Sequence, residues 1–326
     1  MQNQAKTLLV VGGTNIDDIL IIEGDLPQDG KTNAAHSARE IGGGGANSAI
    51  GFQILCQIFG ERFNTELITK LGQNADTPKI LHDLSQCGIA TLDAFEPHST
   101  EIATNTVISH TKGRSIIRQK SFNHNALAIP DFKVREIQAA VRQADLVFIQ
   151  TKHPRIAECA AKEARLNGKT VVVDFSNKEC PETLLDYTDI ALVPAELRFS
   201  HMPQDTTPQQ LAAYLGQKVE RCFISDAGNP TLHWHNGTIS HLPSLQINPK
   251  DSLGAGDLRD AAFCLFLMRQ NSPEMAAEKA NIIASISCEY YGRTWKDDLK
   301  SRLHAFQIFQ PDLSGHDIVA APSSQP

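Results

Sequence analysis

The sequence lacks the features that define membrane proteins, disulfide-rich proteins and zinc proteins. It contains no run of the roughly 18 apolar residues that a transmembrane helix needs. The seven cysteines stand singly, and their odd number without a C-x-x-C pair predicts neither a disulfide framework nor a zinc site. The N-terminal stretch has no long apolar core followed by a small-residue cleavage site. We therefore expect a cytoplasmic protein.

An excess of positive charge is missing as well. The formal net charge is −7 and the pI is about 5.9. An acidic surface argues against non-specific binding of nucleic acid or of an anionic membrane. The proportions of hydrophobic (41%) and charged (21%) residues are those of a globular protein. We expect a small-molecule partner, with no nucleic-acid or membrane partner.

Short apolar strands alternate with helical patterns along much of the chain. Strands are predicted at Thr7–Gly13, Glu66–Gly72, Asp145–Gln150, Thr170–Phe175, Asp189–Val193 and Arg221–Ser225. Repetition of βαβ units predicts an α/β fold, with a doubly wound, mainly parallel sheet and helices on both faces.

Two extended excursions interrupt this repetition. They lie near residues 15–40 and 100–123, and the second reads as a hairpin around Lys112 and Gly113. We expect them to pair into a small sheet, a lid over the ligand crevice of the main sheet. Residues 311–326 are rich in Pro, Ser and Ala, so we assign residues 1–310 to one domain and the remainder to a flexible tail.

Two polar clusters lie near the N-terminus. Asn15 and Asp17 stand two residues apart in an extended segment, so both side chains point the same way and could clamp neighbouring hydroxyls. The stretch GGGGANSA, residues 42–49, places four glycines before a helix that starts near Asn47. Each pattern also fits a simpler interpretation, a solvated turn pair for the first and a tight turn for the second.

The stretch DSLGAGD, Asp251 to Asp257, joins an extended segment to a long apolar helix. Amides of three small residues at a helix start can cradle an anion, helped by the helix dipole. Asp257 stands within reach of such a cradle and could accept the proton of a hydroxyl that attacks phosphorus. The alternative is that Asp257 only caps the helix, and this motif alone does not decide between the two.

The order and spacing of these motifs resemble the ribokinase or phosphofructokinase-B (PfkB) family of carbohydrate kinases, from about residue 7 to 305. The resemblance implies a ribokinase-like kinase domain with a small β-sheet lid. It also implies ATP-dependent phosphorylation of a sugar or related polyol, with Mg²⁺. The residues that it assigns are Asp257 as catalytic base, Gly254, Ala255 and Gly256 as anion hole, and Asn15, Asp17, Gly43, Gly44 and Asn47 as substrate-hydroxyl binders.

The resemblance also implies ligands for the nucleotide and the cations. Glu196 falls where a family glutamate organises Mg²⁺ through water, and Asp251 where some members coordinate a monovalent cation, commonly K⁺. Ser225 is expected at a nucleotide phosphate, and Asn281 and Gly292 beside the adenine. Lid strands in this family often pair between subunits, which implies a homodimer.

The match departs from the family pattern on the nucleotide side. Val193 replaces an asparagine, and Asp226 adds negative charge near the expected nucleotide. Arg259 stands where a phenylalanine is common, and it needs a partner such as Asp260 or a phosphate. These departures leave open a sugar-binding protein or sensor with weak or no phosphotransfer.

Nucleosides and phosphosugars stay open as acceptors. A phosphosugar needs cations near the lid. The candidates are Lys31, Arg39, Lys112, Arg114, Arg118 and Lys120, although a solvated hairpin surface is the simpler interpretation for most of them.

Overall fold

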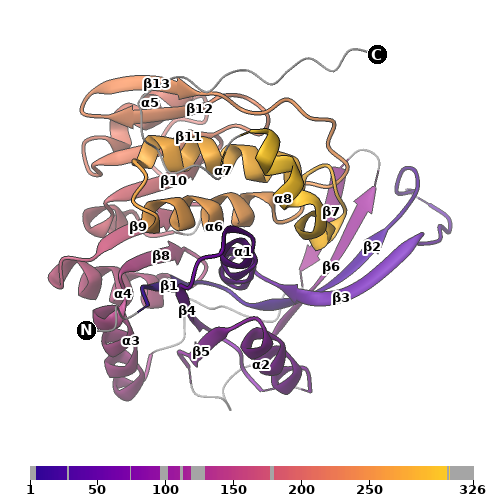
Figure 1. The fold of residues 1–326 in the computed structure, drawn as a ribbon, viewed down its shortest axis with the longest axis horizontal. Helices are drawn as coiled ribbons and strands as arrows, with labels where there is room; N and C mark the ends of the chain where they lie inside the picture. Colours follow the sequence, from indigo (N-terminus) through magenta and orange to yellow (C-terminus); the bar gives the residue numbers. More distant parts are fainter. Residues whose placement is uncertain are drawn as a thin grey trace.

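The structure is a computed structural model that describes residues 5–27, 29–73, 75–95, 102–110, 113–118, 129–176, 180–306 and 308. The predicted tail, residues 311–326, lies outside this range, as do Lys112 and Lys120. Within the described residues the chain forms a nine-stranded main sheet and a separate four-stranded sheet (Figure 1).

The main sheet has the strand order β13-β12-β11-β10-β9-β8-β1-β4-β5. Its strands are β1 (Thr7–Val11), β4 (Asn64–Thr69), β5 (Ile89–Asp93), β8 (Leu146–Gln150), β9 (Thr170–Asp174), β10 (Ile190–Pro194), β11 (Arg221–Ser225), β12 (Thr231–His235) and β13 (Thr238–Leu242). The strands from β11 to β5 pair in parallel, and only β12 and β13 are antiparallel. β1 lies between β8 and β4, so the chain winds outward from it in both directions, and the predicted doubly wound sheet is confirmed.

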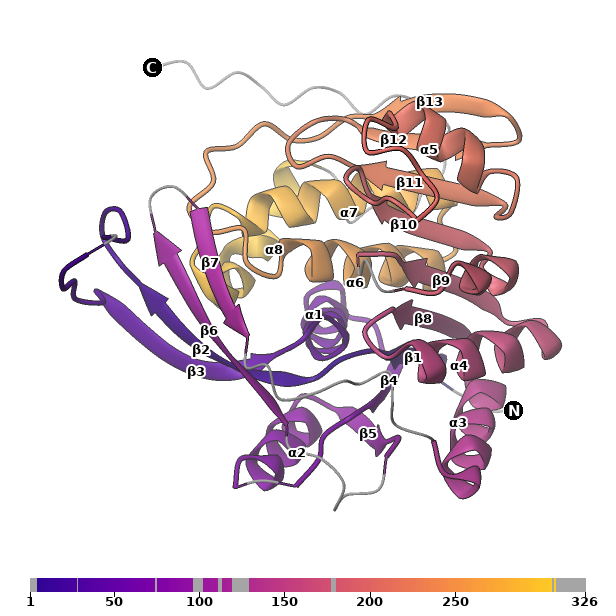
Figure 2. The ribbon, with the colours of Figure 1, turned by 180° about the vertical axis from the view of Figure 1, so that it is seen from behind.

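Helices cover both faces of this sheet (Figures 1 and 2). One face carries α1 (Gly44–Phe59), α2 (Thr77–Gln86), α6 (Ala255–Met268), α7 (Pro273–Ser287) and α8 (Trp295–Ala305). The other carries α3 (Asp131–Gln143), α4 (Pro154–Leu166), α5 (Pro208–Leu215) and the 3₁₀ helix η3 (Glu182–Tyr187). No described helix is long and apolar enough to cross a membrane.

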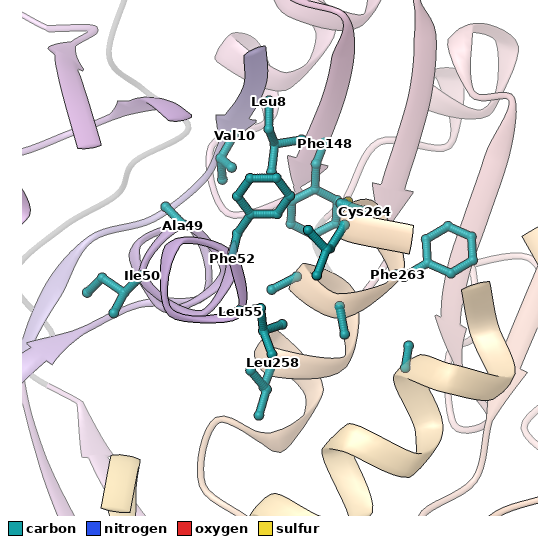
Figure 3. Close-up of a cluster of buried hydrophobic side chains, with 14 of the residues drawn as sticks. Leu8, Val10, Ala49, Ile50, Phe52, Leu55, Phe148, Leu258, Phe263 and Cys264 are labelled. Atoms are coloured by element: carbon teal, nitrogen blue, oxygen red, sulfur yellow. The ribbon is translucent and has the colours of Figure 1, made fainter. Parts of the chain in front are cut away.

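The packing of α1 against α6 decides where the motifs meet. Phe52 and Leu55 of α1 are fully buried with Phe148 of β8 and Phe263 of α6 (Figure 3). Gly51 allows a close approach, because a Cβ atom there would lie 3.2 Å from a methyl group of Leu258. Burying these side chains removes a large apolar surface from water. It also fixes the first turns of the two helices beside each other.

The predicted lid is the four-stranded sheet, in the order β3-β2-β6-β7. Its strands are β2 (Asn15–Ile21), β3 (His36–Gly42), β6 (Ala103–His110) and β7 (Gly113–Arg118). The chain enters it directly from β1, through Gly12 to Thr14. Figure 2 shows the lid projecting sideways from the main body.

Candidate active site

Two cavities meet at the start of α6. The first, which we call the lid cavity, has a volume of about 620 Å³ and lies between lid strands β2, β6 and β7 and the carboxyl ends of β1, β4 and β8. The second, which we call the helix cavity, has a volume of about 700 Å³ and is lined by residues around β11, α6 and α7. Arg114, Ser252 and Gly256 line both. A ligand in one cavity can therefore face a ligand in the other across the first turn of α6.

Asp17 is the centre of a polar cluster on the lid. Its Oδ1 accepts a hydrogen bond from Nδ2 of Asn15 at 2.5 Å and another from Nδ2 of Asn105 at 2.8 Å. Burial raises the pKa of Asp17, and the two amide donors oppose that shift. The sequence predicted the pair of Asn15 and Asp17, and missed Asn105, which lies on the neighbouring strand in register with Asp17.

The glycine loop, which we define as Gly42 to Gly45, lies against the backbone that follows β1. Gly43 has φ of 93°, and a Cβ atom on it would lie 2.5 Å from the carbonyl oxygen of Gly13. A Cβ on Gly45 would lie 2.6 Å from the backbone of Gly12. The helix begins at Gly44, so the last glycines belong to its first turn and bring Asn47 to the edge of the lid cavity.

Asp257 is in contact with Asn47. Its Oδ2 accepts a hydrogen bond from Nδ2 of Asn47 at 2.8 Å, and Oδ1 of Asn47 accepts one from Nη2 of Arg293 at 2.8 Å. Burial raises the pKa of Asp257 to about 6, although the bond from Asn47 opposes the shift. Asp257 is the third residue of α6, and the N-cap position belongs to Gly254, without a side-chain cap. The capping interpretation of Asp257 is therefore wrong.

The first turn of α6 offers backbone donors. Gly254 adopts a left-handed conformation with φ of 74°, which glycine reaches without strain. The amide of Ala255 donates a long bond of 3.3 Å to Ser252, whereas the amides of Gly254 and Gly256 have no acceptor among the described residues. Such donors at a helix start favour an anion.

Residues predicted on the nucleotide side are partly brought together. Ser225, Asn281 and Asp251 line the helix cavity, and Asn281 also donates to the hydroxyl of Thr231 at 3.1 Å. Gly292, at the start of the 3₁₀ helix η4 (Gly292–Thr294), lies outside that lining. Its amide donates to Oδ2 of Asp251 at 3.1 Å.

Glu196 lies on the turn after β10, at the carboxyl end of that strand. Its side chain is exposed and lines neither cavity. Among the described residues, no group of three or more His, Cys, Asp or Glu side chains could hold a metal ion.

The departures noted in the sequence have specific surroundings. Arg259 donates through Nε and Nη2 to Oδ1 of Asp260, at 3.1 and 2.8 Å, so Asp260 is its partner. Asp226 accepts a hydrogen bond from Asn229 on an exposed turn. Asp174 lies near Arg259 and Asp260. Burial together with the charge of Asp260 raises the pKa of Asp174 to about 8.

The chain is similar to known carbohydrate kinases. The pfkB family carbohydrate kinase profile matches residues 5–297. Ribokinase from Arabidopsis thaliana is 27% identical over 321 residues, with 88% of this chain and 77% of that protein covered. Ribokinase from Bacillus subtilis is 26% identical over 294 residues, with 88% and 94% covered.

The fold is shared with solved ribokinases. The structure of Arabidopsis thaliana ribokinase complexed with ribose and ATP matches with a TM-score of 0.70 at 23% identity, over 89% of this chain and 94% of that one. The family profile spans most of the chain and includes every motif described above. The chain belongs to the pfkB family of carbohydrate kinases and is a phosphotransferase.

Proposed function

We propose that this kinase transfers the γ-phosphate of ATP to a hydroxyl of a sugar or related polyol, with Asp257 as general base. The observation that carries the proposal is the position of Asp257 in the lid cavity, one residue from Gly256, which lines both cavities. A hydroxyl bound in the lid cavity would face a phosphate bound in the helix cavity at this point. The solved Arabidopsis relative, complexed with ribose and ATP, supports the pairing of these two substrates.

The chemistry follows from the surroundings of Asp257. The acceptor oxygen forms a bond to the γ-phosphorus while the bond to the bridging oxygen of ADP breaks, and the hydroxyl proton passes to the carboxylate of Asp257. Amides of Gly254, Ala255 and Gly256 stabilise the charge on the phosphoryl oxygens. A pKa of about 6 leaves Asp257 mostly ionised at neutral pH and basic enough to accept the proton.

The acceptor would be held by the lid and the glycine loop. Asp17 and Asn15 would bind neighbouring hydroxyls, and the backbone of Gly43 and Gly44 lies at the cavity wall, open to an approaching ligand. Asn47 lines the same cavity and also orients the carboxylate of Asp257. Positioning of this kind lowers the barrier by placing the hydroxyl in line with the phosphate.

The nucleotide would lie in the helix cavity, with Ser225 near its phosphates and Asn281 deeper in the wall. We assign Gly292 an indirect part, through its bond to Asp251. Mg²⁺ binds through one or two carboxylates and substrate phosphates and keeps several waters. The carboxylate of Glu196 is exposed on the turn after β10, and it would contact Mg²⁺ through one of these waters. When bound, Mg²⁺ neutralises phosphate charge.

Two finer assignments complete the proposal. A monovalent cation, K⁺, would lie beside Asp251, and equal rates in potassium and tetramethylammonium salts would contradict that site. A homodimer would form through the lid, where β7 is an edge strand and Ile117 is 59% exposed. Light scattering in solution tests this assembly.

An acceptor screen tests the proposed reaction. Purified protein, MgATP and a panel of sugars, polyols and nucleosides are combined with coupled detection of ADP. We expect ADP release that depends on one class of polyol. Thermal stabilisation by a sugar with no turnover of any acceptor would instead support the sugar-binding protein without phosphotransfer.

A further inference from the structure

The lid cavity is rich in positive charge, although the whole chain carries a net charge of −7. Its basic side chains are Lys70, Arg114, Arg118 and Lys152, and its carboxylates are Asp17 and Asp257. Charge of one sign in a cleft with low-dielectric walls focuses the field and attracts ligands of opposite charge. The sign of the charges in this cavity therefore indicates the charge of the ligand that binds there.

The lid contributes its two arginines through strand register. Asp17 on β2 pairs with Asn105 on β6, and Asn105 pairs with Arg118 on β7. Residues that lie opposite one another in neighbouring strands project from the same face of the sheet. The side chain of Arg118 therefore lies on the same face of the lid as those of Asp17 and Asn105. Arg118 forms no ion pair with any described residue. Arg114 follows on the same face of β7, since it is four residues away.

The floor contributes two lysines from either side of β1. Lys70 directly follows β4, and Lys152 follows β8, the two strands that flank β1 in the sheet. The stem of Lys152 lies against the backbone of Gly13, because a Cβ there would be 2.8 Å from its Cγ. Lys70 is 3% exposed, and burial lowers the pKa of its ammonium group to about 8, partly offset by Asp93.

The nucleotide does not account for these charges. Arg114 lines both cavities and can serve a phosphate of ATP, but Lys70, Arg118 and Lys152 line only the lid cavity. Gathering like charges in one cavity is unfavourable, and a bound anion would reduce the repulsion between them. A neutral polyol offers no such anion.

We propose that the acceptor of this kinase is an anionic sugar, bearing a phosphate or a carboxylate that Arg118 and Lys152 bind while Asp17 holds its hydroxyls. This inference rests on the proposed function and narrows it to one substrate class. Guanidinium and ammonium groups supply charge-assisted hydrogen bonds to either anion, so the two chemistries share the site.

Another lid arginine provides a matched control. Arg39 on β3 donates to Asp18 at 2.7 Å and to Asp76 at 2.8 Å, and it does not line the lid cavity. The variant Arg39→Met removes a lid cation without touching the cavity. The variants Lys152→Met and Arg118→Met remove charge from the cavity and keep most of the stem, so the contact with Gly13 survives.

The test measures kcat/KM with matched acceptors, namely ribose and ribose 5-phosphate, fructose and its 1- and 6-phosphates, and glucose and gluconate. We expect a phosphate or carboxylate form to exceed its neutral partner. Hydrogen bonds to charged groups contribute about 1.5–3 kcal/mol, so each cavity variant should lose roughly 10- to 100-fold on the anionic acceptor, mainly through KM. KM for ATP should stay the same, and Arg39→Met should behave as wild type. Comparison of the sugar phosphates with gluconate shows whether the cavity prefers a phosphate or a carboxylate.

A clear preference for neutral sugars that Lys152→Met and Arg118→Met leave unchanged would overturn the inference and leave the kinase function intact. If no acceptor is phosphorylated, thermal stabilisation by the same compounds tests whether the lid cavity binds an anionic sugar. Stabilisation by an anionic sugar that Lys152→Met abolishes would support the anionic ligand while the proposed reaction fails. Stabilisation by neutral sugars alone would overturn the inference.

Discussion

Asn47 and Asp257 are 210 residues apart in the sequence, and their side chains share a hydrogen bond of 2.8 Å between Nδ2 and Oδ2. Arg293 fixes the orientation of the amide, because it donates to Oδ1 of Asn47 and so leaves Nδ2 to face the carboxylate. One asparagine thereby links the glycine loop, the start of α6 and the 3₁₀ helix η4, which contains Arg293. The protonation of Asp257 depends on this contact.

The pH dependence of the reaction should reflect the raised pKa of Asp257. Only the carboxylate form can accept a proton, so kcat/KM should fall as the pH drops through about 6. The bond from Asn47 lowers the pKa of Asp257, so its loss in Asn47→Ala should raise that pKa and move the acidic limb to higher pH. Profiles of kcat/KM against pH for both proteins check this. An unmoved limb would assign it to another group.

Replacement of the proposed base should separate chemistry from binding. Asp257→Asn should lower kcat by roughly 10²- to 10⁴-fold, the range of general-base contributions, while the acceptor still binds by calorimetry. Asp298→Asn is a matched control, since Asp298 is also a first-turn aspartate, on the exposed side of α8. Normal turnover by Asp257→Asn would show that the base lies elsewhere.

The motif residues could be predicted because their constraints are local. Asn15 and Asp17 share a strand face by their spacing alone, and Gly43 and Gly45 are needed where backbone meets backbone. The strand pattern predicted the sheet in the same way, because buried parallel strands read as short apolar runs.

The side chains that complete the site could not be predicted from spacing. Asn105 reaches Asp17 through the register of β2 and β6, and Arg293 reaches Asn47 across 246 residues. Charge near the lid was equally ambiguous in the sequence. Arg39 pairs with acidic residues outside the lid cavity, whereas Arg118 lines it, and only the pairing of the strands distinguishes the two.

The ion pair behind the first turn of α6 should matter for stability. Asp260 is buried with a 3% exposed side chain, and Arg259 is its ion-pair partner. Arg259→Met would leave a buried carboxylate uncompensated, which costs about 3–5 kcal/mol of unfolding free energy. The double variant Arg259→Met/Asp260→Asn removes both charges and should recover much of that loss. Urea unfolding of the three proteins measures the effect, and equal stability of the single variant and wild type would contradict it.

Two glycines of the site should respond differently to alanine. A Cβ on Gly45 would lie 2.6 Å from the backbone of Gly12, so Gly45→Ala must push α1 away from β1, and overpacking of this kind costs about 1–3 kcal/mol. A Cβ on Gly256 meets no atom within 4 Å, so Gly256→Ala should keep the thermal stability of the wild type. That methyl group would instead enter the space proposed for the transferring phosphate and raise KM for ATP. Thermal unfolding and ATP kinetics of both variants check the contrast. A stable Gly45→Ala protein, or an unchanged KM in Gly256→Ala, would show that the backbone yields or that the phosphate lies elsewhere.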